Sequence, residues 1–249
     1  MNIDSIIKQL QDYEKEYKTF MGITKFPTYE VKTRKVSQSL ADTQGFESVA
    51  MTFYKPCTKQ HTIAISTNLT MTKYVVFHEF THMYDSEVYA EGNDTRNVGL
   101  SGYTEYHASQ IELLQLLGVD RVGDDFSFTM DRSILTVSGE KSVYQYVKDK
   151  QQHAIDLFSR RDFPADISTL KSAFGVLYNY YGLRSICEMY AIDYVEEIKN
   201  EAFLKIISTQ NYVTMNNLMH GWLNSEQIEL SIKIYLNIIF PLIVEHGFV

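Results

Sequence analysis

The sequence has little cysteine, little proline and no excess of positive charge, and each shortage excludes a class of protein. Its 249 residues include only two cysteines, Cys57 and Cys187, which lie far apart, whereas disulfide-stabilised secreted domains carry many closely spaced cysteines. Four prolines and twelve glycines are too few for long disordered linkers. The formal net charge of −8 argues against a nucleic-acid binder, because a protein that grips the phosphate backbone needs a basic surface.

Long hydrophobic runs are also missing. The longest, "IYLNIIFPLIV" near the C-terminus, is interrupted and shorter than the roughly 20 residues that cross a bilayer. The N-terminal "MNIDSIIKQLQDYEKEY" lacks the basic segment and the unbroken apolar stretch of a signal peptide. We therefore expect a cytoplasmic protein with no membrane partner, no nucleic-acid partner and two free thiols.

The N-terminal half alternates between two hydrophobic periods. Residues 3–17 repeat apolar side chains at helical spacing, which predicts an amphipathic helix. Residues 26–37 and 46–54 alternate in the manner of strands, and residues 61–67 predict a third, more buried strand. Residues 68–89 have helical character with no proline or glycine. The predicted order is a helix, a small and mainly antiparallel sheet, and a second helix.

The remaining chain favours helices. Residues 90–102 are rich in turn formers and predict a loop. A further helix then starts at residue 103 and ends at Gly118, a plausible C-cap. The polar segment 120–133 predicts a domain boundary, and residues 137–249 predict successive helices. We expect an α+β protein with a sheet-containing domain at 1–125 and an all-helical domain at 126–249.

The helix predicted at 68–89 contains a His-Glu-x-x-His pattern at His78, Glu79 and His82. A separation of four puts both imidazoles on one helix face, where both can bind a single Zn²⁺. Glu79 is rotated by about 100° and can instead reach a water at the open metal position. There its carboxylate would take the proton of that water as the water attacks a carbonyl.

The alternative is an accidental pattern on a core helix. Apolar side chains flank the pattern, and a predicted strand precedes it. Two histidines on such a helix are costly unless hydrogen bonds or a metal satisfy them. The context therefore favours zinc.

A catalytic zinc has three protein ligands and a water, so a third ligand must follow His82. Asp85 lies on the same helix as both histidines, where a tetrahedral arrangement would need a bend. Glu91 and Asp94 fall in the predicted loop, and rigid elements hold ligands better.

Three candidates lie on the next predicted helix. Glu112 is two turns beyond Glu105, about 10 Å along the axis, and His107 points about 200° away around the helix. Glu105 begins this predicted helix, and Ala108 one turn on leaves room for close approach. We therefore expect His78, His82 and Glu105 to hold the metal.

These residues resemble the gluzincin pattern, in which a His-Glu-x-x-His helix precedes a second helix that bears Glu-x-x-Ala. Over roughly residues 45–117 the chain is similar to compact intracellular peptidases of the ImmA/IrrE type. The resemblance implies a zincin-like N-terminal half, Zn²⁺ as cofactor, His78, His82 and Glu105 as metal ligands, and Glu79 as general base. Ser109 stands where many gluzincins place an aspartate behind a ligand histidine.

Other polar residues carry weaker signals. Tyr103 and His107 flank Glu105 and are candidate hydrogen-bond donors to a developing oxyanion. Their alternative interpretation is an ordinary surface tyrosine and a helix-face histidine. His153 and His220 stand alone in the helical half, where isolated histidines more often have a structural role.

The sequence thus predicts a zinc metallopeptidase that acts on a peptide or protein substrate, with the helical half forming the opposite wall of a cleft. One alternative is a catalytically silent interaction protein of zincin fold, against which the intact Glu79 counts. Another is a zinc hydrolase of a non-peptide amide, which would use the same water activation. The sequence does not fix the oligomeric state.

Overall fold

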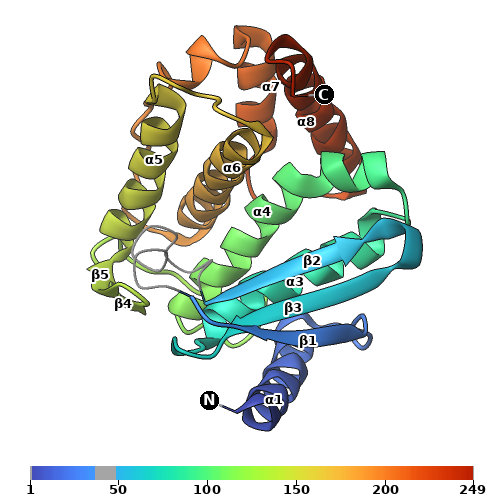
Figure 1. Cartoon of the computed structure of the whole chain (residues 1–249). Coiled ribbons are helices and arrows are strands. Elements are labelled where there is room, and N and C mark those ends of the chain that lie inside the picture. Colours follow the sequence, from blue (N-terminus) through green and yellow to red (C-terminus); the bar gives the residue numbers. More distant parts are fainter. Residues whose placement is uncertain (1, 37–48, 249) are drawn as a thin grey trace. The chain divides into compact units, whose positions relative to one another are not determined.

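The computed structural model describes residues 2–36 and 49–248 and has the expected α+β composition (Figure 1). Its elements are, in chain order, α1 (Ile3–Met21), β1 (Tyr29–Arg34), β2 (Ala50–Lys55), η2 (Pro56–Thr58), β3 (Gln60–Ser66), α3 (Lys73–Tyr89), α4 (Asp94–Leu116), β4 (Ser133–Thr136), β5 (Gly139–Ser142), α5 (Val143–Ser159), α6 (Ile167–Tyr190), η3 (Phe203–Lys205), α7 (Thr209–Leu218) and α8 (Ser225–Glu245). Residues 46–48 of the second predicted strand lie outside the described residues.

The chain forms two compact units. Unit 1 comprises Met1–Asn97, Ile111–Phe126 and Ile134–Lys141, and unit 2 comprises Val98–Gln110, Ser127–Ser133 and Ser142–Val249. Helix α4 therefore contributes residues to both units.

The sheet of unit 1 is mixed, which corrects the prediction of a mainly antiparallel sheet. Its strand order is β1-β3-β2, with β2 antiparallel to β3 and β1 parallel to β3. The β2–β3 pair follows from its short connection, in which Lys59 has φ 50° after the turn at Pro56–Thr58. Because β1 is followed by a longer segment, it can pair with β3 in the parallel sense.

Helix α3 is buried because it packs against both the sheet and α1. Figure 1 shows α3 running along one face of the three strands. The rings of Tyr17 and Phe20 on α1 meet Phe77 edge-on or tilted, at centroid distances of 5.2 and 5.6 Å. The Tyr17 hydroxyl lies 3.1 Å from Thr81 Oγ1, so even the polar end of that ring has a partner inside the core. This packing holds α3 rigidly along the sheet.

The loop predicted at 90–102 is mostly helix. Helix α4 begins at Asp94, where the Asn93 side chain accepts a hydrogen bond from the Arg96 backbone N–H. Asparagine and aspartate favour turns, but the same side chains also cap helix N-termini. The prediction interpreted these residues as turn formers, which was wrong. The glycines instead permit close packing, since a Cβ at Gly102 would lie 2.6 Å from the Tyr178 ring. At the other end, the C-cap is Leu117, one residue before the predicted Gly118, which follows with φ 70°.

The C-terminal half is not wholly helical, because β4 and β5 form a hairpin. Strand β4 alternates exposed and buried residues, and Gly139 provides a φ of 103° after the turn. Helices α5 to α8 agree with the predicted helical segments. Helix α6 is buried around nearly its whole circumference over residues 173–187, as expected for the central helix of unit 2.

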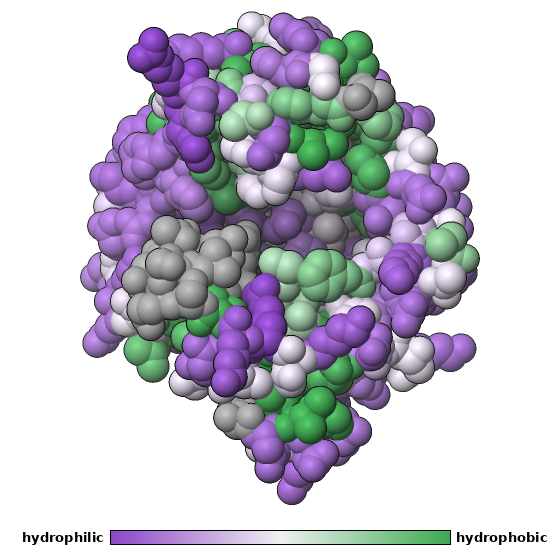
Figure 2. Space-filling view, viewed as in Figure 1, coloured by the Kyte–Doolittle hydropathy of each residue, from purple (hydrophilic) through white to green (hydrophobic). Residues whose placement is uncertain are grey.

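Helix α8 is longer than the apolar run that the sequence shows. It begins with a capping box at Asn224 and Gln227 and continues past Pro241. By length and composition it could cross a membrane, and 44% of its most apolar window is buried inside the structure. On the face that Figure 2 shows, hydrophilic residues predominate and hydrophobic ones form separate small areas.

Candidate metal centre

Helix α3 carries the two histidines on one face. The His78 and His82 ring centroids are 4.7 Å apart, with an interplanar angle of 75°. His78 is buried, whereas His82 is partly exposed. Because α3 has no proline or glycine to interrupt it, two histidines four residues apart lie one turn apart on the same face.

The structure brings Glu105 to these histidines. One ligand atom from each of His78, His82 and Glu105 lies within 4.8 Å of the other two, and together they form a group that could hold a metal ion. Glu105 is in the middle of α4 rather than at its start, and it is partly exposed. One candidate ligand residue is therefore buried and two are partly exposed.

Glu112 supports the site from behind, a role that sequence reasoning did not assign to it. Its Oε2 lies 2.8 Å from His78 Nδ1, and both side chains are almost wholly buried. A carboxylate at Nδ1 orients the ring and leaves Nε2 for a metal. Burial chiefly, together with the negative charge of Glu112, raises the pKa of neighbouring Tyr74 to about 12.

The sequence signal that could have pointed to Glu112 is its spacing from Glu105. Glu105 and Glu112 are seven residues apart, and so lie on nearly the same face of α4. Ser109, at the position where many gluzincins have an aspartate, instead donates to Asn179 Oδ1 at 2.6 Å. The hydroxyl therefore serves the packing of unit 2, and the carboxylate near the histidine comes one turn later.

Glu79 is positioned by strand β2. Its Oε2 accepts a hydrogen bond of 2.8 Å from Thr52 Oγ1, and the side chain is buried. This bond holds one carboxylate oxygen against the sheet.

Tyr103 and His107, the candidate oxyanion donors, contact each other. Their rings stack at a centroid distance of 5.6 Å, and the Tyr103 hydroxyl lies 3.5 Å from His107 Nδ1. Trp222 meets His107 edge-on at 6.1 Å. Both residues are buried, which rules out the ordinary surface tyrosine but leaves their role in the chemistry a prediction.

The other weighed residues have different surroundings. Among the described residues, the group that could hold a metal ion does not include Asp85, Glu91 or Asp94. His220 Nδ1 lies 2.7 Å from Glu188 Oε2 in unit 2. Burial chiefly lowers the pKa of His153 on α5. Both cysteines are free thiols.

Comparison of the chain with models of protein families, with curated proteins and with solved structures gave no match. The functional interpretation therefore depends on the geometry of the site itself.

Proposed function

We propose that this protein is a zinc-dependent hydrolase that cleaves peptide bonds in the cytoplasm, with the residue pattern of a gluzincin. The observation that carries the proposal is the grouping of His78, His82 and Glu105, whose ligand atoms lie within 4.8 Å of one another.

The donor set fits zinc. Two imidazole nitrogens and one carboxylate oxygen are the ligands of many catalytic zinc sites, which keep a fourth position open. Two ligands about 2.1 Å from one ion lie at most about 4.2 Å apart, so small side-chain movements suffice. A zinc ion bound there would polarise a carbonyl group and supply a water with a pKa of about 7.

The chain's own residues would then orient the reacting groups and transfer the proton of the attacking water. Glu112, whose Oε2 lies 2.8 Å from His78 Nδ1, would orient the His78 ring, and the Thr52 hydroxyl donates a hydrogen bond to Oε2 of Glu79. We assign Oε1 of Glu79 as the atom that accepts the proton of the attacking water and passes it to the leaving amine nitrogen. Tyr103 and His107 are our candidates for a hydrogen bond to the substrate carbonyl oxygen.

The bond between Thr52 and Glu79 also favours a hydrolase over a silent interaction protein of the same fold. A purely structural metal site needs no general base, whereas this carboxylate is buried and hydrogen-bonded beside a candidate ligand. A zinc hydrolase of a non-peptide amide would use the same groups, so the test must use peptides.

The proposal is tested with a proteome-derived peptide library and mass spectrometry of newly formed termini. Zinc-loaded protein should generate new termini. Glu79→Gln should bind zinc equally well but cleave about 10²–10⁴ times more slowly, because an amide cannot accept the proton. Equal cleavage by both proteins would remove Glu79 from the mechanism, and no cleavage by the zinc-loaded protein would contradict the peptidase.

A further inference from the structure

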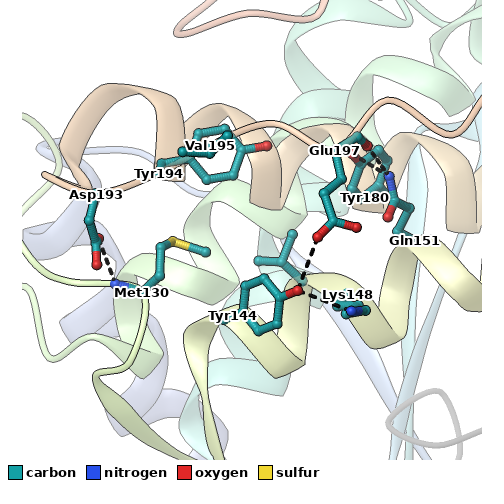
Figure 3. A pocket seen from close by; sticks show the side chains of 10 residues that line it. Met130, Tyr144, Lys148, Gln151, Tyr180, Asp193, Tyr194, Val195 and Glu197 are labelled. Atoms are coloured by element: carbon teal, nitrogen blue, oxygen red, sulfur yellow. Dashed lines mark hydrogen bonds between the residues drawn. The ribbon is translucent and has the colours of Figure 1, made fainter.

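Unit 2 contains a cavity of about 180 Å³ that involves none of the candidate metal-site residues. It lies among α5, α6, Met130 and the irregular segment 191–200, which follows α6. Figure 3 shows its lining side chains pointing toward one another from these elements. Met130 and Val147 are both buried, and we call them the floor of the cavity.

The polar groups around this cavity bond to one another. Gln151 Nε2 donates to the Tyr180 hydroxyl and to the Glu197 carbonyl oxygen, both at 2.9 Å. The Tyr144 hydroxyl donates to Glu197 Oε1 at 3.1 Å and accepts from Lys148 Nζ at 3.0 Å (Figure 3). An uncharged ligand that enters here therefore leaves these polar groups paired with one another, which avoids the cost of unsatisfied polar groups.

The mouth of the cavity is apolar and open to solvent. Val195 is 81% exposed and Tyr144 is 42% exposed. Exposed apolar side chains beside a buried apolar floor are typical of ligand-binding surfaces. A bound molecule would cover these side chains and gain the free energy of their removal from water.

The size and the walls favour one aromatic ring. An apolar cavity of about 150 Å³ holds benzene, so this cavity accommodates a ring with one small substituent. Tyr144, Tyr180 and Tyr194 provide aromatic walls, and Met130 provides a polarisable sulfur. Offset or edge-on ring contacts and sulfur–ring contacts each favour an aromatic guest over an aliphatic one. Burial raises the pKa of Tyr180 and Tyr194, so the hydroxyls of both walls stay neutral.

We propose that this cavity is a binding site for a small, uncharged, single-ring aromatic molecule. Binding would link α5 to the segment 191–200, since Val147 and Val195 line the cavity from these two parts of the chain. This site is independent of the proposed hydrolase chemistry.

The test is a titration of the full-length protein with 4-fluorophenol, in which ¹⁹F NMR monitors binding. We expect saturable binding that Val147→Phe weakens by at least about tenfold, because the larger side chain fills the floor. The matched control is Val244→Phe on α8, where the side chain is 70% exposed and outside the cavity lining; it should bind as the wild type does.

A second pair of variants avoids any change in the core. Val195→Glu places a carboxylate at the mouth and should weaken binding, whereas Ile192→Glu, on the same segment but outside the lining, should not. Absence of saturable binding, or equal binding by Val147→Phe and Val195→Glu and their controls, would overturn the proposal.

Three further measurements define the ligand. Cyclohexanol should bind more weakly than 4-fluorophenol, and equal affinity would contradict the preference for a ring. N-acetyltyrosinamide should also bind more weakly, since tighter binding would mean that the cavity takes a protein side chain instead. His78→Ala should bind 4-fluorophenol normally, because loss of binding there would place the phenol at the metal site.

Discussion

At the scale of single residues, the candidate centre depends on a few buried polar atoms that have been given partners. His78 illustrates this, because a buried imidazole is costly unless both ring nitrogens are satisfied. Glu112 Oε2 lies 2.8 Å from Nδ1, and the two further candidate ligands lie nearby. The Thr52 hydroxyl donates a hydrogen bond to one oxygen of Glu79.

Glu112→Gln should therefore weaken zinc binding without removing it. The amide keeps the shape and can still accept from Nδ1–H, but the lost negative charge makes His78 a poorer ligand. Loss of such a partner typically costs about 10–100-fold in metal affinity. Competition with a fluorescent zinc chelator measures the change.

The matched control is Ser109→Ala, one turn earlier on α4, which should leave zinc affinity unchanged because Ser109 bonds to Asn179. If Ser109→Ala weakens zinc binding and Glu112→Gln does not, Glu112 is not the carboxylate that supports His78.

His61 on β3 is a separate titratable residue with a predictable effect on stability. It is 1% exposed, stacks on Tyr54 at 4.4 Å, and its Nε2 lies 3.1 Å from Glu87 Oε2. Burial lowers its pKa below the ordinary value, although Glu87 opposes this shift. Protonation therefore favours the unfolded chain, and this residue's contribution to stability is lost as the pH falls below about 6.5.

His61→Phe keeps a ring against Tyr54 and removes the titration. Urea unfolding between neutral and mildly acidic pH should show the variant losing less stability than the wild type. The difference should not exceed about 1.4 kcal/mol per pH unit. Parallel pH profiles for the two proteins would mean that His61 does not titrate differently in the folded state.

At the scale of elements, the close packing of α4 on α6 within unit 2 depends on glycine. A Cβ at Gly182 would lie 2.1 Å from the Tyr106 carbonyl oxygen and 2.9 Å from Ser109 Cβ. A backbone atom cannot rotate away as a side chain can, so one of the two helices would have to move.

Gly182→Ala should lower the free energy of unfolding by about 1–3 kcal/mol or more, measured by urea denaturation. Gly175→Ala in the same helix is the control, since its Cβ would meet the Glu105 side chain at an ordinary 3.5 Å. There the helix propensity of alanine should offset any loss, by up to about 1 kcal/mol. Equal destabilisation by both variants would contradict the close approach at Gly182.

Sequence patterns within a single segment predicted most of the helices. Helix α1 follows from apolar periodicity, and α3 lies in a segment of helical character without proline or glycine. Helices α5 to α8 lie within the range predicted as successive helices. The start of α4 was wrong, since Asn93 caps the helix and Gly102 lies under Tyr178. The role of Gly102 is not visible without knowing which residue packs against it, whereas Asn93 carries a local signal that fits either a turn or a helix cap.

At the scale of the whole molecule, His78, Glu79 and His82 were predictable because one helix fixes their relation. The third metal ligand had to be chosen among six candidates. The element and the helix face on which each candidate lies excluded all but Glu105. Glu112 was weighed only as a ligand and set aside for its distance along α4. Its contact with His78 depends on the register of α4 against α3, and no local pattern encodes that register.

The two proposed sites use different residues. The proposed chemistry depends on α3, α4 and Thr52 on β2, whereas the aromatic-ring cavity lies wholly in unit 2. The variants that probe one site can therefore serve as controls for the other.

The most direct test of the central claim is an anomalous-difference map from crystals of zinc-loaded protein, measured on both sides of the zinc absorption edge. Our account predicts one strong peak per chain, with Nε2 of His78, a ring nitrogen of His82 and a Glu105 carboxylate oxygen at about 2.0–2.2 Å. A map with no peak among these side chains, or with another residue in place of Glu105, would contradict it.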